Sequence, residues 1–369
     1  MLMETINPRR RRELRAVLRA GRMSRSQLVA ATQLRKNTVL TDVAALLAEG
    51  VLREVAQAVP SGGRPRTPLE IDPIARHVVG VSIEPGCVQA RRMNLLGEPT
   101  SPPAAAKVRS PKHLVPTAER LLRDQLDDRT LMVGVTAPGF IDRSSHELRF
   151  SAAAPRRTPL SLAPLVALAG DRPVVLENDV HARAACWLAV HRPPQRHDTL
   201  FVGLEDGRLG ATLLIDGRPN LGSVGGANEL GHNRLPIDTP RCYCGHQGCL
   251  ERIFSTPYLR HIKPAATRDL ADRIRRCDRA ADAGLRRIIE LLAHGLANAV
   301  NLLRVETLVL ATRLPDSQPF LDKLADAVRS HVLAELNRRL QIQSHIDTQT
   351  QPPDAAAQAA LARLFYDGW

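Results

Sequence analysis

The feature that most restricts how this chain can fold is a cluster of one histidine and three cysteines. His232, Cys242, Cys244 and Cys249 lie within eighteen residues with the spacing H-x9-C-x-C-x4-C. Three thiolates and one imidazole are the ligands that tetrahedral Zn²⁺ prefers in structural sites, and they leave no coordination position for water. The spacing therefore predicts a structural zinc site, and the alternative is a group of reduced cysteines that binds no metal.

Two carboxylates flank this cluster, Glu229 before it and Glu251 after it. A metal-bound loop would hold both side chains in fixed positions beside His232. Since carboxylates accept hydrogen bonds from neighbouring hydroxyl groups, the arrangement indicates a binding site for a polyhydroxylated ligand.

The size and charge of the chain restrict the class of protein. A length of 369 residues allows about two or three domains. The formal net charge of +13 is consistent with a polyanionic partner such as nucleic acid, although an arginine-rich composition can also follow genome composition. Six cysteines without an apolar export segment favour a reducing, cytoplasmic location. No apolar run is long enough to span a bilayer, so we expect no membrane partner.

Residues 1–72 have the pattern of a winged helix-turn-helix DNA-binding domain. Helices are predicted at 11–21, 24–32 and 35–50, where Ser24 is a favourable N-cap and Gly50 ends the third helix. Residues 51–59 and 67–72 follow as two wing strands. The apolar stripe of the third helix is predicted to consist of Val39, Leu40, Val43, Leu46 and Leu47.

The start of the third helix carries the predicted DNA contacts, because a recognition helix presents the polar side chains of its first turns to base edges. These residues are Arg35, Lys36, Asn37, Thr38 and Thr41. Between the wing strands, Arg64 and Arg66 in SGGRPRT are placed to enter a narrow minor groove, where the potential is most negative. The alternatives are a solvated helix surface and a flexible hinge between domains.

From Ile71 onward, β-rich segments alternate with helical ones, which predicts an α/β architecture. The order fits two lobes of the actin-like sugar-kinase type with a cleft between them. We expect one lobe at 73–180, joined by a C-terminal helix near 354–366, and a second lobe with the zinc site at 181–353. Buried strands are predicted at 77–85, 130–142, 171–179, 199–207, 210–217 and 306–312, and long helices at 113–126, 180–190, 268–303, 320–340 and 354–365.

Four motifs then become informative together: VGVTAPGFID, ENDVHARAA, GGANELGH and CYCGHQGCLE. Through them the chain resembles, over essentially its whole length, the ROK family (repressors, open reading frames and kinases), in the branch with an N-terminal winged helix-turn-helix. The resemblance implies a two-lobed actin-like fold, with His232 ligating zinc through one ring nitrogen and reaching the sugar through the other. The sugar contacts that it implies are Asn178, Asp179, Glu229, His232 and Glu251.

In a kinase of this family, Asp179 would be the general base that deprotonates the attacking sugar hydroxyl. The alternative role is to cap the helix that begins after it. Asn228 stands where the family has a glycine, which places a side chain where the backbone would approach the ligand.

The segments where the family binds Mg·ATP depart from its pattern. The first phosphate loop, D-x-G-G-T in the family, corresponds to residues 82–87, where the aspartate is absent, Glu84 adds negative charge and Pro85 removes an amide donor. The second loop reads GRLGATLL in place of G-x-G-x-G, and the segment V-x-G-G reads VLATRL. These changes predict that the chain has no catalytic residues and is not an enzyme.

Together, the features predict a transcriptional regulator, most simply a repressor, that binds operator DNA as a homodimer or a dimer of dimers. A sugar or sugar phosphate in the cleft would set the spacing of two winged helices and so change DNA affinity. Two alternatives stay open. One is an ATP-dependent ROK hexokinase with a fused DNA-binding module, and the other is a sugar-insensitive regulator controlled by a protein partner.

Overall fold

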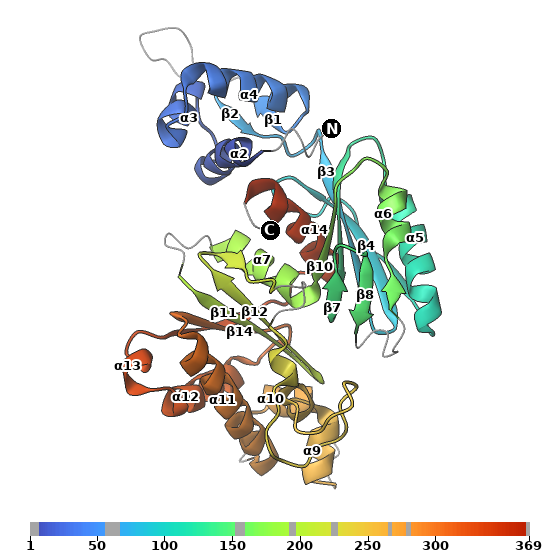
Figure 1. Ribbon diagram of the computed structural model, residues 1–369, viewed down its shortest axis with the longest axis vertical. Coiled ribbons are helices and arrows are strands. Elements are labelled where there is room, and N and C mark those ends of the chain that lie inside the picture. Colours follow the sequence, from blue (N-terminus) through green and yellow to red (C-terminus); the bar gives the residue numbers. More distant parts are fainter. Residues whose placement is uncertain are drawn as a thin grey trace. The chain divides into compact units, whose positions relative to one another are not determined.

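The computed structural model describes residues 7–55, 67–151, 159–191, 197–222, 228–264, 268–277 and 282–366. The chain divides into two compact units: unit 1 comprises Met1–Ala189 and Gln351–Trp369, and unit 2 comprises Val190–Thr350. Strands and helices alternate in both units, which confirms the predicted α/β class (Figure 1).

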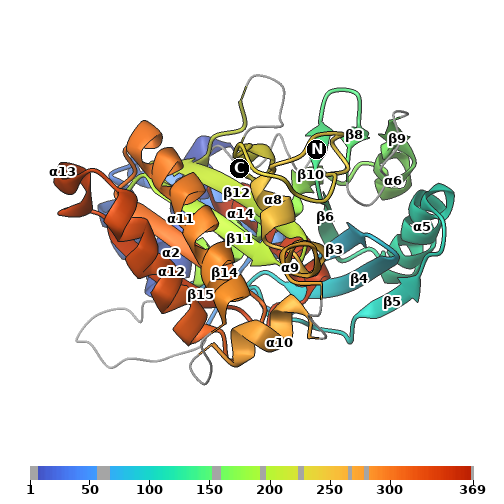
Figure 2. The same ribbon diagram turned by 90° about the horizontal axis from the view of Figure 1, so that it is seen from below.

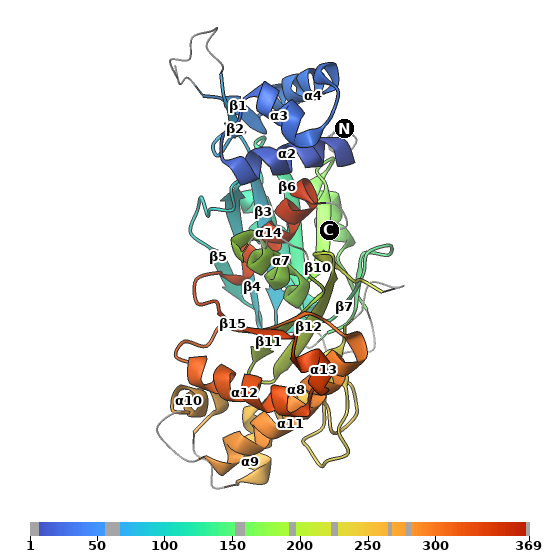
Figure 3. The same cartoon turned by 90° about the vertical axis from the view of Figure 1, so that its left-hand side faces the viewer.

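The N-terminal domain has the predicted order of three helices and a two-stranded antiparallel wing (Figure 3). Local sequence sets the helix ends. The Asn7 side chain accepts a hydrogen bond from the Arg10 amide at 3.0 Å, and Ser24 forms a capping box with Gln27. The elements are α2 (Pro8–Ala20), α3 (Arg25–Thr32), α4 (Lys36–Ala48), β1 (Leu52–Glu54) and β2 (Leu69–Ile71).

Apolar side chains from the three helices form the core of this domain. Leu40 departs from the predicted stripe of α4, because it lies ~100° around the helix from Val39 and is 39% exposed. Arg9 and Arg10 of α2 bind the buried Asp42 carboxylate of α4 at 2.6 and 3.0 Å, which ties the two helices together. The buried core residues include Leu14, Val17, Leu28, Val39, Val43 and Leu46.

Unit 1 also contains a five-stranded sheet in the order β10-β6-β3-β4-β5. Strands β3, β4 and β5 form an antiparallel meander. Strand β6 pairs parallel to β3, and β10 pairs parallel to β6. Helices α5 (Leu114–Gln125) and α6 (Ala163–Ala169) lie over one face (Figure 1). The strands are β3 (His77–Glu84), β4 (Cys87–Asn94), β5 (Ala104–Lys107), β6 (Thr130–Ala137) and β10 (Val174–Asn178).

The C-terminal helix α14 (Pro352–Phe365) covers the other face of this sheet. Its alanines pack against two strand glycines. A Cβ atom on Gly80 would lie 1.9 Å from the carbonyl oxygen of Pro353, and one on Gly134 would lie 1.9 Å from that of Ala356. Small residues are therefore required on both sides of this contact.

Unit 2 contains a second five-stranded sheet, in the order β13-β12-β11-β14-β15. An antiparallel meander is again extended by two parallel strands, so the two units have the duplicated topology expected for an actin-like fold. Helices α11 (Ala283–Leu303) and α12 (Gln318–His331) lie side by side over one face (Figure 2). The strands are β11 (Thr199–Glu205), β12 (Arg208–Ile215), β13 (Arg218–Pro219), β14 (Thr307–Thr312) and β15 (Gln341–Ile346).

The helical stretch predicted at 268–303 is two helices, α10 (Leu270–Arg275) and α11. The first helix ends at Arg275, and α11 begins at its N-cap Asp282, whose carboxylate accepts the amides of Gly284 and Leu285 at 3.0 and 3.1 Å. The stretch predicted at 320–340 likewise divides into α12 and the short α13 (Ala334–Asn337).

The remaining elements are short, apart from α7. They are η1 (Pro111–His113), β7 (Phe140–Asp142), β8 (Glu147–Phe150), β9 (Leu160–Ser161), α7 (Asp179–His191), η2 (Leu230–His232), α8 (Leu250–Ile253) and α9 (Thr256–Ile262). Within the described part of the chain, no helix has both the length and the apolar character needed to cross a membrane.

Candidate functional site

The four side chains of the predicted zinc site converge in unit 2. One ligand atom from each of them lies within 4.8 Å of the others. The Cys244 and Cys249 sulfurs are 3.6 Å apart, and Cys242 Sγ lies 3.6 Å from His232 Nδ1. Zinc–sulfur bonds of ~2.3 Å in tetrahedral geometry place sulfurs ~3.8 Å apart, whereas a disulfide requires ~2 Å. The donor set and its spacing therefore fit a tetrahedral dication.

Two glycines shape the loop that carries these ligands. Gly245 and Gly248 adopt left-handed backbone conformations, with φ of 90° and 83°. A Cβ atom on Gly248 would lie 2.1 Å from the Leu235 carbonyl oxygen. Cys242 and Cys249 are buried, and burial raises the pKa of both thiols. The loop thus holds its three sulfurs close together, with Cys242 and Cys249 buried and Cys244 half-buried, which suits a structural metal.

The second ring nitrogen of His232 faces a residue that the sequence analysis did not include. His232 Nε2 lies 3.1 Å from the Tyr243 hydroxyl, and the two rings meet edge to face at 5.2 Å. Burial lowers the pKa of His232, which favours the neutral ring that ligates a metal. Tyr243 is therefore a positioning residue for His232. The position of Tyr243 between the predicted ligands Cys242 and Cys244 is the one sign of this role in the sequence.

The two flanking carboxylates differ in burial. Glu251 is 5% exposed, and one of its oxygens accepts the Leu209 amide at 3.4 Å. Burial raises the pKa of Glu251 to about 7. Its Oε1 atom is buried without a hydrogen-bond partner among the described residues, a state that a hydroxyl-bearing ligand would relieve. The Glu229 side chain is 42% exposed, with Oε2 at 3.9 Å from His232 Nε2.

Asn178 and Asp179 lie in unit 1, where β10 meets α7. The Asn178 Oδ1 atom accepts the amides of Val180 and His181 at 2.8 and 3.3 Å, and its Nδ2 atom donates to the Gly139 carbonyl at 3.0 Å. Asn178 is therefore the main cap of α7. Within the described residues, Asp179 hydrogen-bonds only to the Val180 amide, at 3.0 Å, so most of its accepting capacity is available to a ligand.

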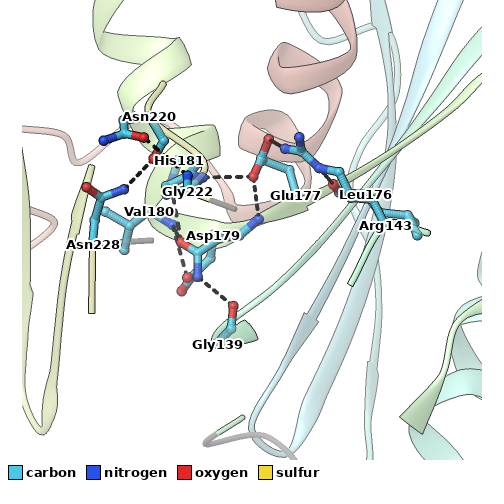
Figure 4. Close-up of polar contacts among 11 residues, drawn as sticks. Gly139, Arg143, Leu176, Glu177, Asp179, Val180, His181, Asn220, Gly222 and Asn228 are labelled. Atoms are coloured by element: carbon cyan, nitrogen blue, oxygen red, sulfur yellow. Dashed lines mark hydrogen bonds and ion pairs between the residues drawn. The ribbon is translucent and has the colours of Figure 1, made fainter. Parts of the chain in front are cut away.

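A buried charge network holds this turn in place (Figure 4). Glu177 Oε1 lies 2.9 Å from His181 Nδ1 and accepts the Asn178 amide at 2.9 Å, and Oε2 pairs with Arg143. Burial alone would raise the pKa of Glu177, but His181, Arg143 and the Asn178 amide outweigh it and hold the pKa below its ordinary value. The ionised carboxylate fixes the backbone of the two predicted sugar contacts.

The predicted DNA contacts lie at the start of α4. Thr38 is half-buried, and the exposed Leu40 adds an apolar side chain of the kind that contacts a thymine methyl group. Arg64 and Arg66, predicted in the wing, lie outside the described residues. The other four predicted contacts are exposed: Arg35, Lys36, Asn37 and Thr41.

The model of the ROK family matches residues 105–362, which is 258 of the 369 residues. The chain belongs to the ROK family. The match confirms the resemblance found in the four sequence motifs, and the fold has the two actin-like sheets that this resemblance implied.

ROK proteins of two kinds are similar to this chain. The xylose repressor of Bacillus subtilis (strain 168) is 23% identical over 350 residues, which cover 89% of this chain and 88% of the repressor. A solved ROK family transcriptional regulator, a homologue of the E. coli Mlc protein, superposes with a TM-score of 0.79 at 20% identity, over 99% of this chain and 97% of that one. The ROK glucokinase of Streptomyces griseus, solved with glucose and AMPPNP, gives a TM-score of 0.61 at 22% identity, over 77% of this chain and 98% of the kinase.

The segment corresponding to the first ROK phosphate loop is a tight hairpin between β3 and β4. Glu84 pairs with Cys87, so Pro85 and Gly86 form a two-residue turn in which Gly86 has a φ of 77°. Pro85 has no backbone N–H, so only Gly86 can donate from the turn, and the carboxylate-bearing Glu84 directly precedes the turn in sequence. The turn is therefore a poor site for a triphosphate.

The two segments that correspond to the other ROK nucleotide loops also present side chains where the ROK pattern has glycines. At the β11–β12 hairpin, Glu205 forms ion pairs with Arg208 and with Arg313, the latter at 3.7 Å. Ala311 and Thr312 are buried within β14. Glycine backbone that could approach a nucleotide closely is replaced here by paired charges and buried side chains.

Proposed function

We propose that this ROK protein is a sugar-responsive transcriptional repressor that binds operator DNA through its N-terminal domain. The observation that carries the proposal is the exposed polar start of α4, on a winged helix-turn-helix joined to a ROK fold. The similarity to xylose repressors extends over 89% of the chain and supports the same function. The net charge of +13 favours a polyanionic partner.

In this proposal, α4 enters the major groove and the wing arginines Arg64 and Arg66 reach the minor groove. Two copies of the chain, as a homodimer or a dimer of dimers, would bind the two halves of a pseudo-palindromic operator. The base-edge and phosphate contacts would come from Arg35, Lys36, Asn37, Thr38 and Thr41.

The metal in this proposal is Zn²⁺, held by the cluster of three cysteines and one histidine. Its role is structural: bound metal would fix the loop that begins at Glu229 and ends at Glu251. The observation in support is the 3.6 Å spacing of the Cys244 and Cys249 sulfurs, which is that of shared metal ligation and not of a disulfide.

The effector is proposed to be a sugar or sugar phosphate. Two features support this class of ligand: the buried Oε1 of Glu251 that lacks a partner among the described residues, and the Asp179 carboxylate with its remaining accepting capacity. Carboxylates and an amide suit the vicinal hydroxyl groups of a sugar. The proposed contacts are Asn178, Asp179, Glu229, His232 and Glu251, with a sugar hydroxyl taking the place of the Tyr243 hydroxyl at His232 Nε2.

We propose further that the chain does not transfer phosphate. The supporting observations are the Pro85–Gly86 turn and the Glu205 ion pairs at the segments that would bind nucleotide. A ROK kinase fused to a DNA-binding domain is the second candidate, because Asp179 is placed at the start of α7 with a carboxylate able to act as a base. Coupled detection of ADP release, with a panel of pentoses, hexoses and amino sugars, separates the two candidates.

The proposal is tested with the full chain and labelled DNA from upstream of its own coding region. Fluorescence anisotropy measures the dissociation constant across the same sugar panel and across salt concentrations. We expect specific binding that weakens steeply with salt and weakens again with one sugar. Specific binding that no sugar changes would support control by a protein partner, and ADP release above background would support the kinase.

A further inference from the structure

A second group of potential metal ligands lies in unit 2, on the two helices that cover its sheet. Glu290 and His294 are one turn apart on α11, and His331 is the last residue of α12. One ligand atom from each of the three side chains lies within 4.8 Å of the other two. This group shares no residue with the cysteine cluster, and neither the sequence motifs nor the proposed function uses it.

The hydrogen bonds of the three residues favour metal binding. His294 Nδ1 lies 2.9 Å from the backbone carbonyl oxygen of Glu290. Because a carbonyl oxygen only accepts, Nδ1 carries the proton and the neutral ring keeps its lone pair on Nε2. Metal-bound histidines are oriented in this way, by donating the other ring nitrogen to a backbone carbonyl. His331 Nε2 lies 3.3 Å from Glu290 Oε1, so imidazole and carboxylate already adjoin.

The protein backbone around the group is held in place, while the side chains have room to turn. Asn301 of α11 donates to the His331 carbonyl at 3.4 Å and accepts the Leu333 amide at 3.0 Å, which fixes the end of α12 against α11. The side chains of Glu290, His294 and His331 are 49%, 49% and 29% exposed. A cation can therefore reach the group from solvent, where the two imidazole rings are tilted by 43° with their centroids 3.9 Å apart.

We propose that Glu290, His294 and His331 form a second metal site, which binds a borderline transition-metal dication and links α11 to α12. Two imidazoles and one carboxylate select Zn²⁺, Ni²⁺ or Cu²⁺ over Mg²⁺ and Ca²⁺. Three protein ligands leave at least one coordination position for water, so this site is open and exchangeable, unlike the closed cysteine site.

Nickel is the suitable probe, because it favours imidazole ligands and its content is measured independently of zinc. The full chain as purified, without a polyhistidine tag, is dialysed against a low excess of Ni²⁺, and both metals are counted by mass spectrometry. We expect one nickel per chain and unchanged zinc. The variant carrying His294→Ala and His331→Ala should bind at least tenfold less nickel. The control His113→Ala removes an exposed histidine of unit 1 and should bind as the parent does.

A thermal unfolding measurement completes the test. Without nickel, the double variant should unfold at nearly the parent's temperature, because the replaced side chains lie at the surface. With nickel, the midpoint should rise for the parent and the control but not for the double variant. Equal nickel content in the parent and the folded double variant, or no nickel on the parent, would overturn the proposal. If the double variant fails to fold, Glu290→Gln replaces it, with the same result expected.

Discussion

Glu13, in the first helix of the N-terminal domain, is a buried carboxyl whose replacement should change how stability depends on pH. The residue is fully buried, and neither carboxyl oxygen has a hydrogen-bond partner among the described residues. Burial, with a smaller contribution from the Asp42 carboxylate, raises the pKa of Glu13 from 4.5 to about 8. The side chain is therefore protonated in the folded domain at neutral pH and ionised in the unfolded chain.

The raised pKa sets both the sign and the size of the effect. The contribution of Glu13 to stability is fully present below pH 4.5 and is lost progressively as the pH rises to about 8. In this window each pH unit costs ~1.4 kcal/mol, so wild type should lose ~3 kcal/mol between pH 5 and pH 7 relative to Glu13→Gln, which cannot ionise.

Hydrogen exchange of the amides of α2 and α4 measures this loss within the domain itself. The free energy of opening is compared between wild type and Glu13→Gln at pH 5, 6 and 7. Glu54→Gln is the matched control, because Glu54 lies in the same domain with a side chain 47% exposed, and its exposed ion pair with Arg25 contributes little. Parallel pH dependences for wild type and Glu13→Gln would refute the reasoning.

Four further predictions concern the DNA, sugar, metal and core contacts. Lys36→Ala should weaken operator binding and reduce the steepness of log Kobs against log salt by about 1. The control Lys112→Ala in unit 1 should keep the affinity and the slope of the parent, and an unaltered slope for Lys36→Ala would exclude a phosphate contact. Asp179→Asn should reduce the sugar response at least tenfold and leave DNA affinity without sugar intact, as anisotropy measures; full retention of the response would exclude Asp179 from the sugar site. Cys244→Ser should lose the zinc that survives dialysis against a weak chelator, measured by elemental analysis, whereas Cys87→Ser, a change outside the cysteine cluster, should retain it. Gly134→Ala should destabilise unit 1 by about 1–3 kcal/mol in urea unfolding, because its Cβ would lie 1.9 Å from the Ala356 carbonyl oxygen; unchanged stability would mean that α14 packs more loosely than the structure indicates.

The strands that the sequence predicted are those with continuous apolar runs, such as β3, β6 and β14. Strands β4 and β15 were not among the strands predicted from the sequence. In β4 the run CVQARRMN places glutamine and arginine at half-buried positions, and β15, QIQSHI, contains no fully buried residue. An edge or half-solvated strand lacks the apolar signal, and only its pairing with a neighbour identifies it.

In the site, too, features that lie in one short segment were predictable from the sequence, and contacts between distant segments were not. The cysteine cluster was predictable, because its four ligands lie within one short segment and metal geometry limits their spacing. The partnership of Glu177 with Arg143 was not, since 34 positions separate the two residues and only the folded sheet brings them together. Asn and Asp are equally favourable helix N-caps, so the sequence does not distinguish Asn178 from Asp179. The structure identifies Asn178 as the main cap, because its side chain accepts the amides of Val180 and His181.

The central claim, that sugar binding and operator binding are coupled in one chain, is tested most directly by measuring each affinity with and without the other ligand. Calorimetry gives the sugar affinity of the full chain, free and saturated with operator DNA, and anisotropy gives the operator affinity with and without that sugar. Linkage requires the same factor in both directions, and we predict about fivefold or more. A sugar that binds with equal affinity to the free and the DNA-bound chain would contradict the account.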